Sequence, residues 1–347
     1  MSEKNNGLVL GLAAGAAAFG ALATWQRMSR RYDFQDKVVL ITGGSRGLGL
    51  VLARELGSNG AKIAIAARDR EELKRARLDL EQRGAEVFDA VCDVRDQSEV
   101  ERLVSDVRSR FGQVDVLVNN AGIIQVGPLE AQTQKDFEEA MRIHYWGPFY
   151  AMKAVLPEMR QRGEGRIVNI VSIGGKIAVP HLAPYCASKF ALAGLSSAMH
   201  VELAKDNIIV TTVYPGLMRT GSHINAFFKG QNAKEYAMFS IMNGLPTNSV
   251  AAERAARQIV EAARRGDSEL IISLPAKVAA KLHGLFPEFT TAILAASNRL
   301  LPSEGGIGTG IATGLESTSA AAPSVLTSLA DAASYRNNEL KPNQTIH

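Results

Sequence analysis

Three polar side chains in the middle of the chain have the types and the order needed for acid–base chemistry. Tyr185 and Lys189 are four positions apart, so on a helix they lie on one face. A neighbouring ammonium favours the phenolate, so we expect the pKa of Tyr185 to fall below its usual value of about 10, towards neutrality. Ser172 follows the apolar segment 166–171, and its hydroxyl can hydrogen-bond an oxygen that gains negative charge. We predict that Ser172, Tyr185 and Lys189 form a catalytic group.

A glycine-rich segment earlier in the chain has the pattern of a phosphate-binding loop. It lies between the apolar run 38–41 and a helix-forming stretch, and it consists of Gly43, Gly44, Ser45, Arg46, Gly47, Leu48 and Gly49. Glycines allow a tight turn and let the backbone approach a pyrophosphate, while the helix that follows supplies free N–H groups and a favourable dipole. Because the loop follows a predicted strand inside a strand–helix–strand unit, we predict that it binds a dinucleotide.

The end of the second predicted strand indicates which dinucleotide binds. An Asp or Glu at this place holds the ribose 2′-hydroxyl of NAD, but the chain has Ala66, Ala67 and Arg68 there. Arg68 and Arg46 have the forked geometry that suits a 2′-phosphate. Asp69 comes one or two positions late. We therefore predict NADP(H) as the cofactor, with NAD(H) as the alternative.

The elements that position these residues follow from the alternation of apolar runs and helical stretches. Apolar runs predict strands at residues 38–41, 62–66, 86–91, 114–118, 165–171, 208–214 and 270–274. Helices are predicted at 48–58, 71–82, 98–111 and 250–265, with long helical stretches before the strands that begin at 165 and 208. This alternation predicts an α/β fold, a Rossmann-type doubly wound parallel sheet in a single domain, residues 36–275, with terminal extensions.

In their order and spacing, these motifs resemble the short-chain dehydrogenase/reductase family from about Lys37 to Leu274. The matching pieces are Thr42-Gly43-x3-Gly47-x-Gly49, Cys92-Asp93-Val94, Asn119-Asn120-Ala121-Gly122, Ser172, Tyr185-x3-Lys189 and Tyr214-Pro215-Gly216. The resemblance implies an oxidoreductase that moves a hydride between a nicotinamide and a carbonyl/alcohol pair. It also implies a homo-oligomer, since relatives commonly form dimers or tetramers.

The resemblance also assigns roles at the cofactor site. It implies that Asp93 contacts the adenine and that Lys189 binds the hydroxyls of the nicotinamide ribose. Two residues, Asn119 and Asn120, would steady the sheet near the adenosine. The nicotinamide half of the cofactor would be bordered by Pro215, Gly216 and Thr220. The motif residues Val94 and Gly122 complete the predicted cofactor site.

One position departs from the family's pattern. Many members carry an Asn, in an Asn-x-x-Gly context, on the helix before the Ser strand, and that Asn is thought to hold a water that relays protons to the Lys. Here the matching residues are His144-Tyr145-Trp146-Gly147. We assign His144 to the catalytic group, where it would hold such a water or relay protons itself, because histidine titrates near neutrality. The alternative is a buried histidine whose nitrogens are satisfied by hydrogen bonds.

The beginning of the chain has the composition of a membrane anchor. Residues Gly7 to Trp25 contain no charge, and such a segment, at about 1.5 Å per residue, is close to the thickness of the bilayer's hydrocarbon core. Basic residues follow the uncharged segment in the remainder of residues 1–35, which predicts that the catalytic domain faces the cytoplasm. The alternatives are a signal peptide cleaved near Ala21-Leu22-Ala23 and an amphipathic segment packed on a cytoplasmic enzyme.

Three later segments have distinct compositions. Residues 219–246 lack clear periodicity and follow a predicted strand, so we expect a lid over the substrate, with an irregular surface connection as the alternative. Residues 276–302 form an amphipathic extension in which Val278, Leu282 and Leu285 share a face, as in an interfacial helix or one packed on the domain. Residues 303–347 are rich in Gly, Ser, Thr and Ala, which predicts a flexible tail.

Composition excludes other classes of protein. The formal net charge of +4 is spread along the chain, so we expect no nucleic-acid partner. The two cysteines, Cys92 and Cys186, have neither metal-ligand spacing nor a disulfide framework, so we expect no metal site.

We expect a small lipophilic carbonyl or secondary alcohol as substrate, since a membrane anchor makes a hydrophobic molecule the natural partner. The alternative function is a non-catalytic NADP(H)-binding sensor or scaffold.

Overall fold

The computed structural model describes residues 31–346, and its centre is a seven-stranded parallel sheet. The strands are β1 (Val38–Thr42), β2 (Lys62–Ala67), β3 (Val87–Val91), β4 (Val116–Asn119), β6 (Gly165–Ile170), β7 (Ile208–Pro215) and β11 (Glu269–Ile272). Their order across the sheet is β11-β7-β6-β4-β1-β2-β3, and every pairing is parallel. The chain reverses its winding between β1 and β4, where open α/β sheets bind ligands. The predicted doubly wound fold is confirmed.

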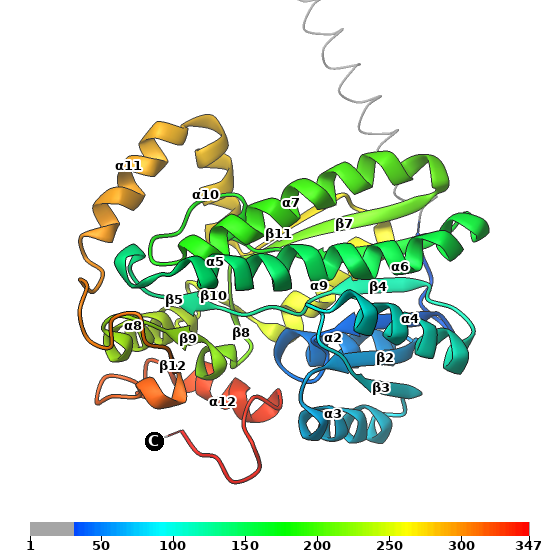
Figure 1. Ribbon diagram of the computed structural model, residues 1–347, viewed down its shortest axis with the longest axis horizontal. Coiled ribbons are helices and arrows are strands. Elements are labelled where there is room, and N and C mark those ends of the chain that lie inside the picture. Colours follow the sequence, from blue (N-terminus) through cyan, green and yellow to red (C-terminus); the bar gives the residue numbers. More distant parts are fainter. Residues whose placement is uncertain (1–30, 347) are drawn as a thin grey trace, which may run out of the picture.

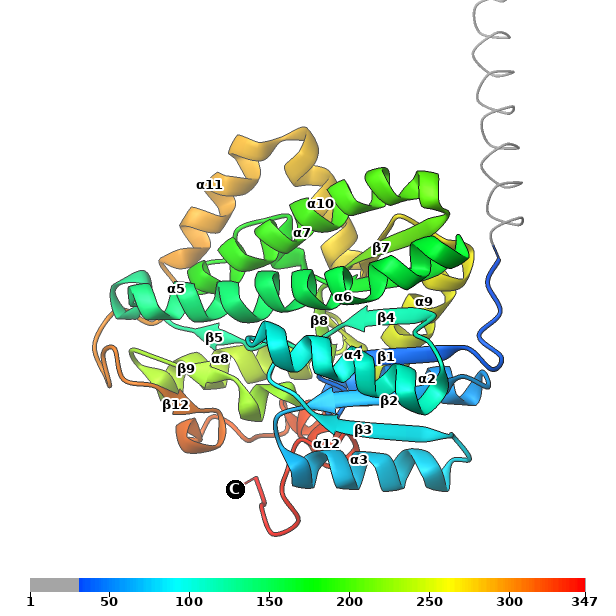
Figure 2. The same cartoon turned by 45° about the vertical axis from the view of Figure 1, so that its right-hand side comes forward.

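Helices cover both faces of this sheet (Figures 1 and 2). One face carries α2 (Gly47–Ser58), α3 (Arg70–Gln82) and α9 (Ala252–Arg265). The other face carries α4 (Gln97–Phe111), α6 (Gly147–Arg162) and α7 (Ala183–Leu203). Helix α5 (Gln134–Met141) runs through a π-helical turn, Arg142–Trp146, into α6.

Two apolar cores, one on each face of the sheet, hold the layers together. Successive side chains of a strand point to opposite faces, and in β1 Val39 and Ile41 enter the core under α2 and α9, whereas Val38 and Leu40 enter the core under α4 and α6. All four are buried. Because both faces are covered, strands such as β1 are continuous apolar runs, which is the pattern that made them predictable.

The segment that follows β7 is an ordered lid over the carboxyl ends of the strands. It contains β8 (Leu217–Arg219), a 3₁₀ turn at Ser222–Asn225, β9 (Phe227–Phe228), α8 (Asn232–Gly244) and β10 (Ser249–Ala251). Strand β8 pairs with β10, and β9 pairs with both β5 (Gln125–Val126) and β12 (Ala312–Thr313). Phe228 and Tyr236 are buried in a small core of the lid. The expectation of a lid over 219–246 thus agrees with the structure better than an irregular surface connection.

Two helices after β11 form a hairpin that projects from the body of the molecule (Figure 1). They are α10 (Leu274–Leu285) and α11 (Pro287–Asn298). The predicted apolar face of α10 does not pack on the domain, because the exposed fraction is 48% for Val278 and 72% for Leu285. Phe289, on α11, is 61% exposed. The hairpin therefore presents apolar side chains to its surroundings.

The final segment is folded, so the prediction of a flexible tail over 303–347 is wrong for the part that the structure describes. It contains β12 and α12 (Ser328–Arg336), and Ala330 and Ala333 are buried. Small side chains let this segment approach the lid closely, since a Cβ on Gly221 would lie 2.4 Å from Cα of Ser334. Few of its large apolar residues are buried, and hydrogen bonds such as that from Ser334 to the carbonyl oxygen of Gly221 help to hold the segment in place.

The predicted membrane anchor, residues 7–25, lies outside the described residues. Within residues 31–346, no helix is both long and apolar enough to cross a bilayer.

Candidate active site

A cavity of about 850 Å³ opens at the carboxyl ends of the strands, where the chain reverses its winding. Its walls come from the glycine-rich loop, the ends of β2, β4 and β6, helix α7 and the lid. Most of the predicted site residues line it: Gly43, Ser45, Arg46, Gly47, Leu48, Arg68, Asp93, Val94, Asn120, Gly122, His144, Ser172, Tyr185, Lys189, Pro215, Gly216 and Thr220. The predicted residues Gly44, Gly49 and Asn119 do not line the cavity.

The glycine-rich loop has the backbone that a phosphate cradle requires. Gly43 and Gly47 have φ angles of +66° and +55°, a conformation that side chains disfavour. A Cβ on Gly49 would lie 2.1 Å from the carbonyl oxygen of Gly43, so only glycine lets α2 begin so close to the turn. A Cβ on Gly44 would lie 2.6 Å from Ile65. Gly44 and Gly49 therefore act by packing, and the loop and the cavity volume fit a dinucleotide.

Two asparagines hold the neighbouring strand ends in place. Asn120 donates from Nδ2 to the carbonyl oxygens of Thr42 and Gly43, at 3.2 and 2.9 Å. Asn119 is buried and donates to Oδ1 of Asn169 on β6 at 2.8 Å. These bonds tie β4 to the glycine-rich loop and to β6, which agrees with the implied role of steadying the sheet.

Arg68 is the exposed cation at the far end of the cavity, after β2. Asp69, the late acid of the sequence pattern, caps α3 by accepting from the N–H groups of Glu71 and Glu72, each at 2.9 Å. These hydrogen bonds lower the pKa of Asp69, and its carboxylate therefore serves as the cap of α3. Asp93 lines the cavity nearby, and Arg95 binds its carboxylate.

The predicted catalytic side chains meet at the other end of the cavity. Ser172 follows β6, and its hydroxyl hydrogen-bonds the phenol of Tyr185. Lys189, one turn along α7 from Tyr185, has its Nζ 5.7 Å from the centre of the tyrosine ring. The Lys189 ammonium donates to the carbonyl oxygen of Ile170 at 2.9 Å. The residues therefore come together as the spacing predicts.

The expected fall in the pKa of Tyr185 is wrong. Burial raises the pKa of Tyr185 to about 12, and the Ser172 hydrogen bond only partly offsets this effect. Burial also lowers the pKa of Lys189 to about 7, so its ammonium exerts less influence than the sequence argument assumed. Tyr185 is thus a neutral phenol, in the form that donates a proton.

His144 lies in the π-helical turn before α6, and both of its ring nitrogens have partners. Nε2 accepts from the N–H of Ile123 at 3.1 Å, so Nδ1 carries the proton and faces Oγ of Ser188 at 2.8 Å. The hydroxyl of Ser188 in turn donates to the carbonyl oxygen of Tyr185 at 2.8 Å. Burial and the nearby Lys189 hold the pKa of His144 well below its usual value. This geometry favours the alternative of a satisfied buried histidine over that of a proton relay.

The remaining wall is made by the end of β7 and the lid. Pro215 ends β7, and the N–H of Gly216 donates to the carbonyl oxygen of Ile272 at 3.1 Å. Thr220 is buried and donates from its hydroxyl to Ser222 at 2.9 Å. A Cβ on Gly122 would lie 3.0 Å from Nε2 of His144, so this glycine lets the loop after β4 pass close to the histidine.

The sequence prediction missed the lining residues that the lid and the C-terminal segment contribute. They are Leu217, Met218, Ser222, Asn225, Ala226, Phe227, Phe239, Asn243 and Glu339. The lid residues belong to a segment that we expected to cover the substrate, but its lack of periodicity gave no way to choose among them. Glu339 had no signal at all, because it lies in the predicted flexible tail.

The fold and the site together define a dinucleotide-binding oxidoreductase, and comparison with known proteins identifies the family. Residues 37–228 match the family described as short chain dehydrogenase. A dehydrogenase/reductase SDR family protein 7-like of Anopheles gambiae is 35% identical over 254 residues, which cover 72% of this chain and 78% of that protein. The gluconate 5-dehydrogenase of Gluconobacter oxydans is 36% identical over 181 residues, 52% of this chain and 71% of that enzyme. The chain belongs to the short-chain dehydrogenase family.

Solved structures agree with this assignment. An actinorhodin polyketide ketoreductase with NADPH has a TM-score of 0.61 and 32% identity, and the match covers 68% of this chain and 95% of that one. The L-sorbose reductase of Gluconobacter frateurii, complexed with NADPH and L-sorbose, has a TM-score of 0.63 and 27% identity, covering 70% and 97%. The protein is therefore an oxidoreductase that uses a nicotinamide cofactor and acts on a small-molecule carbonyl or alcohol.

Proposed function

We propose that this protein is an NADP(H)-dependent reductase or dehydrogenase that interconverts a ketone and a secondary alcohol on a hydrophobic small molecule. The observation that carries the proposal is the group of Ser172, Tyr185 and Lys189 at one end of a cavity whose other end is a glycine-rich phosphate loop. A single cavity thus joins the phosphate loop to the space for a substrate beside the phenol of Tyr185.

Each catalytic side chain has a distinct task in this proposal. When bound, the cofactor supplies or accepts the hydride at the carbonyl carbon. The phenol of Tyr185 donates its proton to the substrate oxygen during reduction, and the hydroxyl of Ser172 hydrogen-bonds the same oxygen as its charge develops. Lys189 holds the ribose hydroxyls on the nicotinamide side, and in its protonated form it favours the phenolate of Tyr185.

The preference for NADP(H) follows from the charges after β2. Arg68 lines the cavity and makes no ion pair among the residues that the structure describes, which leaves its guanidinium available for a 2′-phosphate. Asp69, the acid that follows β2 in the sequence, is engaged in capping α3. The related ketoreductase and sorbose reductase structures, both with NADPH, agree with this preference.

The proposed hydrophobic substrate follows from the lining near Tyr185. The side chains there are apolar and come mainly from the lid and from the loop after β4: Ile123, Ile124, Val179, Leu182, Phe227 and Phe239. The cations of the lining, Arg46, Arg68 and Lys189, belong to the proposed cofactor side, so the substrate side has no partner for an acidic group within the described residues. An uncharged lipophilic ketone fits such a pocket.

The cofactor preference is tested by Arg68→Asp, with Arg70→Asp as the matched control. Arg70 is also exposed, begins α3 and does not line the cavity. Titration of NADPH and NADH by protein fluorescence should give a dissociation constant for NADPH that rises roughly 10- to 100-fold in Arg68→Asp, the value of one charge-assisted contact. NADH binding should be unchanged or tighter, and Arg70→Asp should behave as the wild type. Equal loss of both nucleotides would contradict the role of Arg68.

A further inference from the structure

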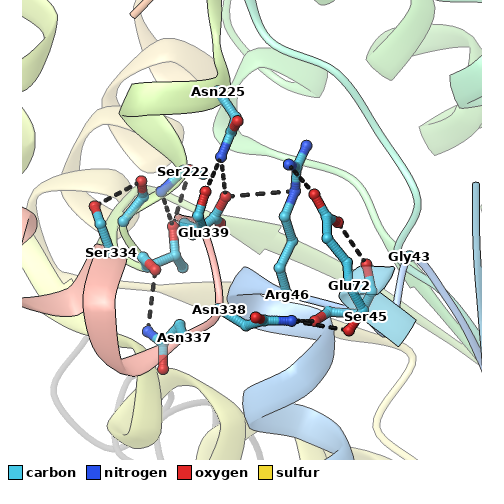
Figure 3. A network of polar contacts seen from close by, with 12 residues as sticks. Gly43, Ser45, Arg46, Glu72, Ser222, Asn225, Ser334, Asn337, Asn338 and Glu339 are labelled. Atoms are coloured by element: carbon cyan, nitrogen blue, oxygen red, sulfur yellow. Dashed lines mark hydrogen bonds and ion pairs between the residues drawn. The ribbon is translucent and has the colours of Figure 1, made fainter. Parts of the chain in front are cut away.

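The C-terminal segment crosses the phosphate end of the proposed cofactor cavity. We call residues 334–340 the C-terminal strap. Its residues Ser334, Asn337, Glu339 and Leu340 are buried, and Figure 3 shows how it connects the lid to the glycine-rich loop. On the lid side, Ser334 donates to the carbonyl oxygen of Gly221. The strap is therefore part of the site, although it lies outside residues 37–228, which match the family.

Several hydrogen bonds hold the strap to the dinucleotide-binding half of the molecule. Asn338 donates from Nδ2 to the carbonyl oxygens of Ser45 and Glu72, at 2.8 and 3.0 Å. Arg54, on α2, donates to Oδ1 of Asn337 at 3.1 Å. The strap is thus fixed on both sides of the groove that a dinucleotide would enter.

The strap takes the hydrogen-bonding groups that a phosphate would use. The N–H of Gly47, at the start of α2, donates to the carbonyl oxygen of Asn337 at 2.9 Å. Oε1 of Glu339 would lie only 2.5 Å from a Cβ on Gly47, so this carboxylate fills the space that the glycine leaves open beside the helix terminus. In Rossmann-type sites that space lets the backbone approach the pyrophosphate.

Arg46 is also occupied by acidic side chains. Its Nη1 lies 3.0 Å from Oε1 of Glu72, and its Nε lies 3.4 Å from Oε2 of Glu339 (Figure 3). The same Oε2 accepts from Nδ2 of Asn225 at 2.7 Å. A buried carboxylate at this place would repel the pyrophosphate of a dinucleotide, since like charges in a poorly solvated site interact strongly.

From these contacts we propose that Glu339 determines the affinity of the cofactor site: the C-terminal strap stands in for the phosphates, and the dinucleotide must displace it in order to bind. The proposal rests on the proposed function, because it assumes that the cavity takes a dinucleotide. It makes the free energy of releasing the strap a part of every binding event, so the strap lowers the affinity of the site for the dinucleotide.

The first test is Glu339→Gln, which keeps the size of the side chain and an acceptor for Asn225 but removes the charge. NADPH titration of the full chain should give a dissociation constant that is lower by roughly 10-fold. This is the effect of removing one charge-assisted contact from the state in which the strap is docked. Glu304→Gln, an exposed carboxylate of the C-terminal segment outside the strap, should leave the constant unchanged. An unchanged or weakened affinity in Glu339→Gln would overturn the proposal, and weakened affinity would mean that the strap clasps the bound cofactor.

A second measurement follows the strap itself. Trypsin can cut after Arg336, whose side chain is exposed, but the next residue, Asn337, is buried while the strap is docked. Cleavage there, measured by mass spectrometry, should become several-fold faster in Glu339→Gln without nucleotide and in the wild type with saturating NADPH. Protection by NADPH would overturn the proposal. If neither protein binds NADPH or NADH, the proposed function fails and the strap proposal falls with it; NADPH binding with unaltered cleavage contradicts the strap proposal alone.

Discussion

Lys189 is buried among uncharged groups, and this burial has a measurable effect on stability. The pKa of its ammonium falls to about 7 in the folded protein, whereas an unfolded lysine titrates near 10.4. Between these values the unfolded chain binds more protons than the folded one, so the free energy of unfolding rises with pH. A lysine with a lowered pKa therefore costs stability below pH 7, and this cost disappears as the pH increases.

We expect this cost to appear when the wild type is compared with Lys189→Met. Between pH 7 and 9 the wild type should gain on the order of 2 kcal/mol of stability relative to the variant. Other titrating groups, including both cysteines, remain in the two proteins, so the difference isolates Lys189. Urea unfolding of the cofactor-free chains at both pH values measures it. Parallel pH profiles would show that Lys189 is not titrating in this range.

Single residues also show what sequence reasoning can and cannot provide at this site. Ser172, Tyr185 and Lys189 were predictable because a strand end and a helical spacing of four positions fix their relative places. The pKa of Tyr185 was not, because it depends on burial by residues that surround it in space. Asp69 was read as a possible ribose ligand, and only its bonds to α3 reveal it as a helix cap.

At the scale of elements, the turn from β1 into α2 depends on the absence of a side chain. Ala in place of Gly49 would bring its Cβ to 2.1 Å from the carbonyl oxygen of Gly43, so the helix would have to move away from the loop. Gly194, on α7, is a matched control because it is exposed and a Cβ there would meet nothing within 4 Å.

These two helical glycines should respond in opposite directions. Gly194→Ala should raise stability by about 0.4–1 kcal/mol, because alanine restricts the unfolded chain and favours the helix. Gly49→Ala should lower the melting temperature and weaken dinucleotide binding. Thermal unfolding and NADPH titration of both variants provide the measurement. A Gly49→Ala protein that is as stable and binds as well as Gly194→Ala would contradict the packing argument.

Most of the regular elements could be predicted, and the reason is local. The strands of the central sheet are mostly apolar, so β2, predicted at 62–66, is observed at Lys62–Ala67. The C-terminal strap could not be predicted, because its contacts are between distant positions: Asn338 and Ser45 are 293 positions apart. Its residues are small or polar, and such a composition is also that of a flexible segment.

For the whole molecule, the sequence predicts attachment to a membrane. The uncharged segment 7–25 remains a predicted anchor. The hairpin of α10 and α11 adds exposed apolar side chains, among them Leu285 and Phe289, on the body of the protein. A lipophilic substrate would be concentrated at such a surface.

Flotation with lipid vesicles tests the attachment. The full chain should rise with the vesicles through a density gradient, whereas a chain of residues 32–347 should stay at the bottom. This shorter chain keeps Tyr32, whose buried ring belongs to the core. If the hairpin binds lipid by itself, the shorter chain will float too, and Leu285→Glu should then release it. A full chain that stays at the bottom would contradict membrane attachment.

The measurement that tests the central claim most directly is the turnover of Tyr185→Phe beside its NADPH binding. Tyr150→Phe, on α6 and away from the cavity, controls for the loss of a phenol. The rate of NADPH oxidation is measured with a panel of lipophilic ketones. In Tyr185→Phe this rate should be lower than in the wild type by about 10²-fold or more, which is the effect of losing a general acid. The NADPH dissociation constant of the variant should stay within about threefold of the wild-type value. Turnover that survives in Tyr185→Phe, or a wild type that binds NADPH but reduces no ketone, would contradict the account.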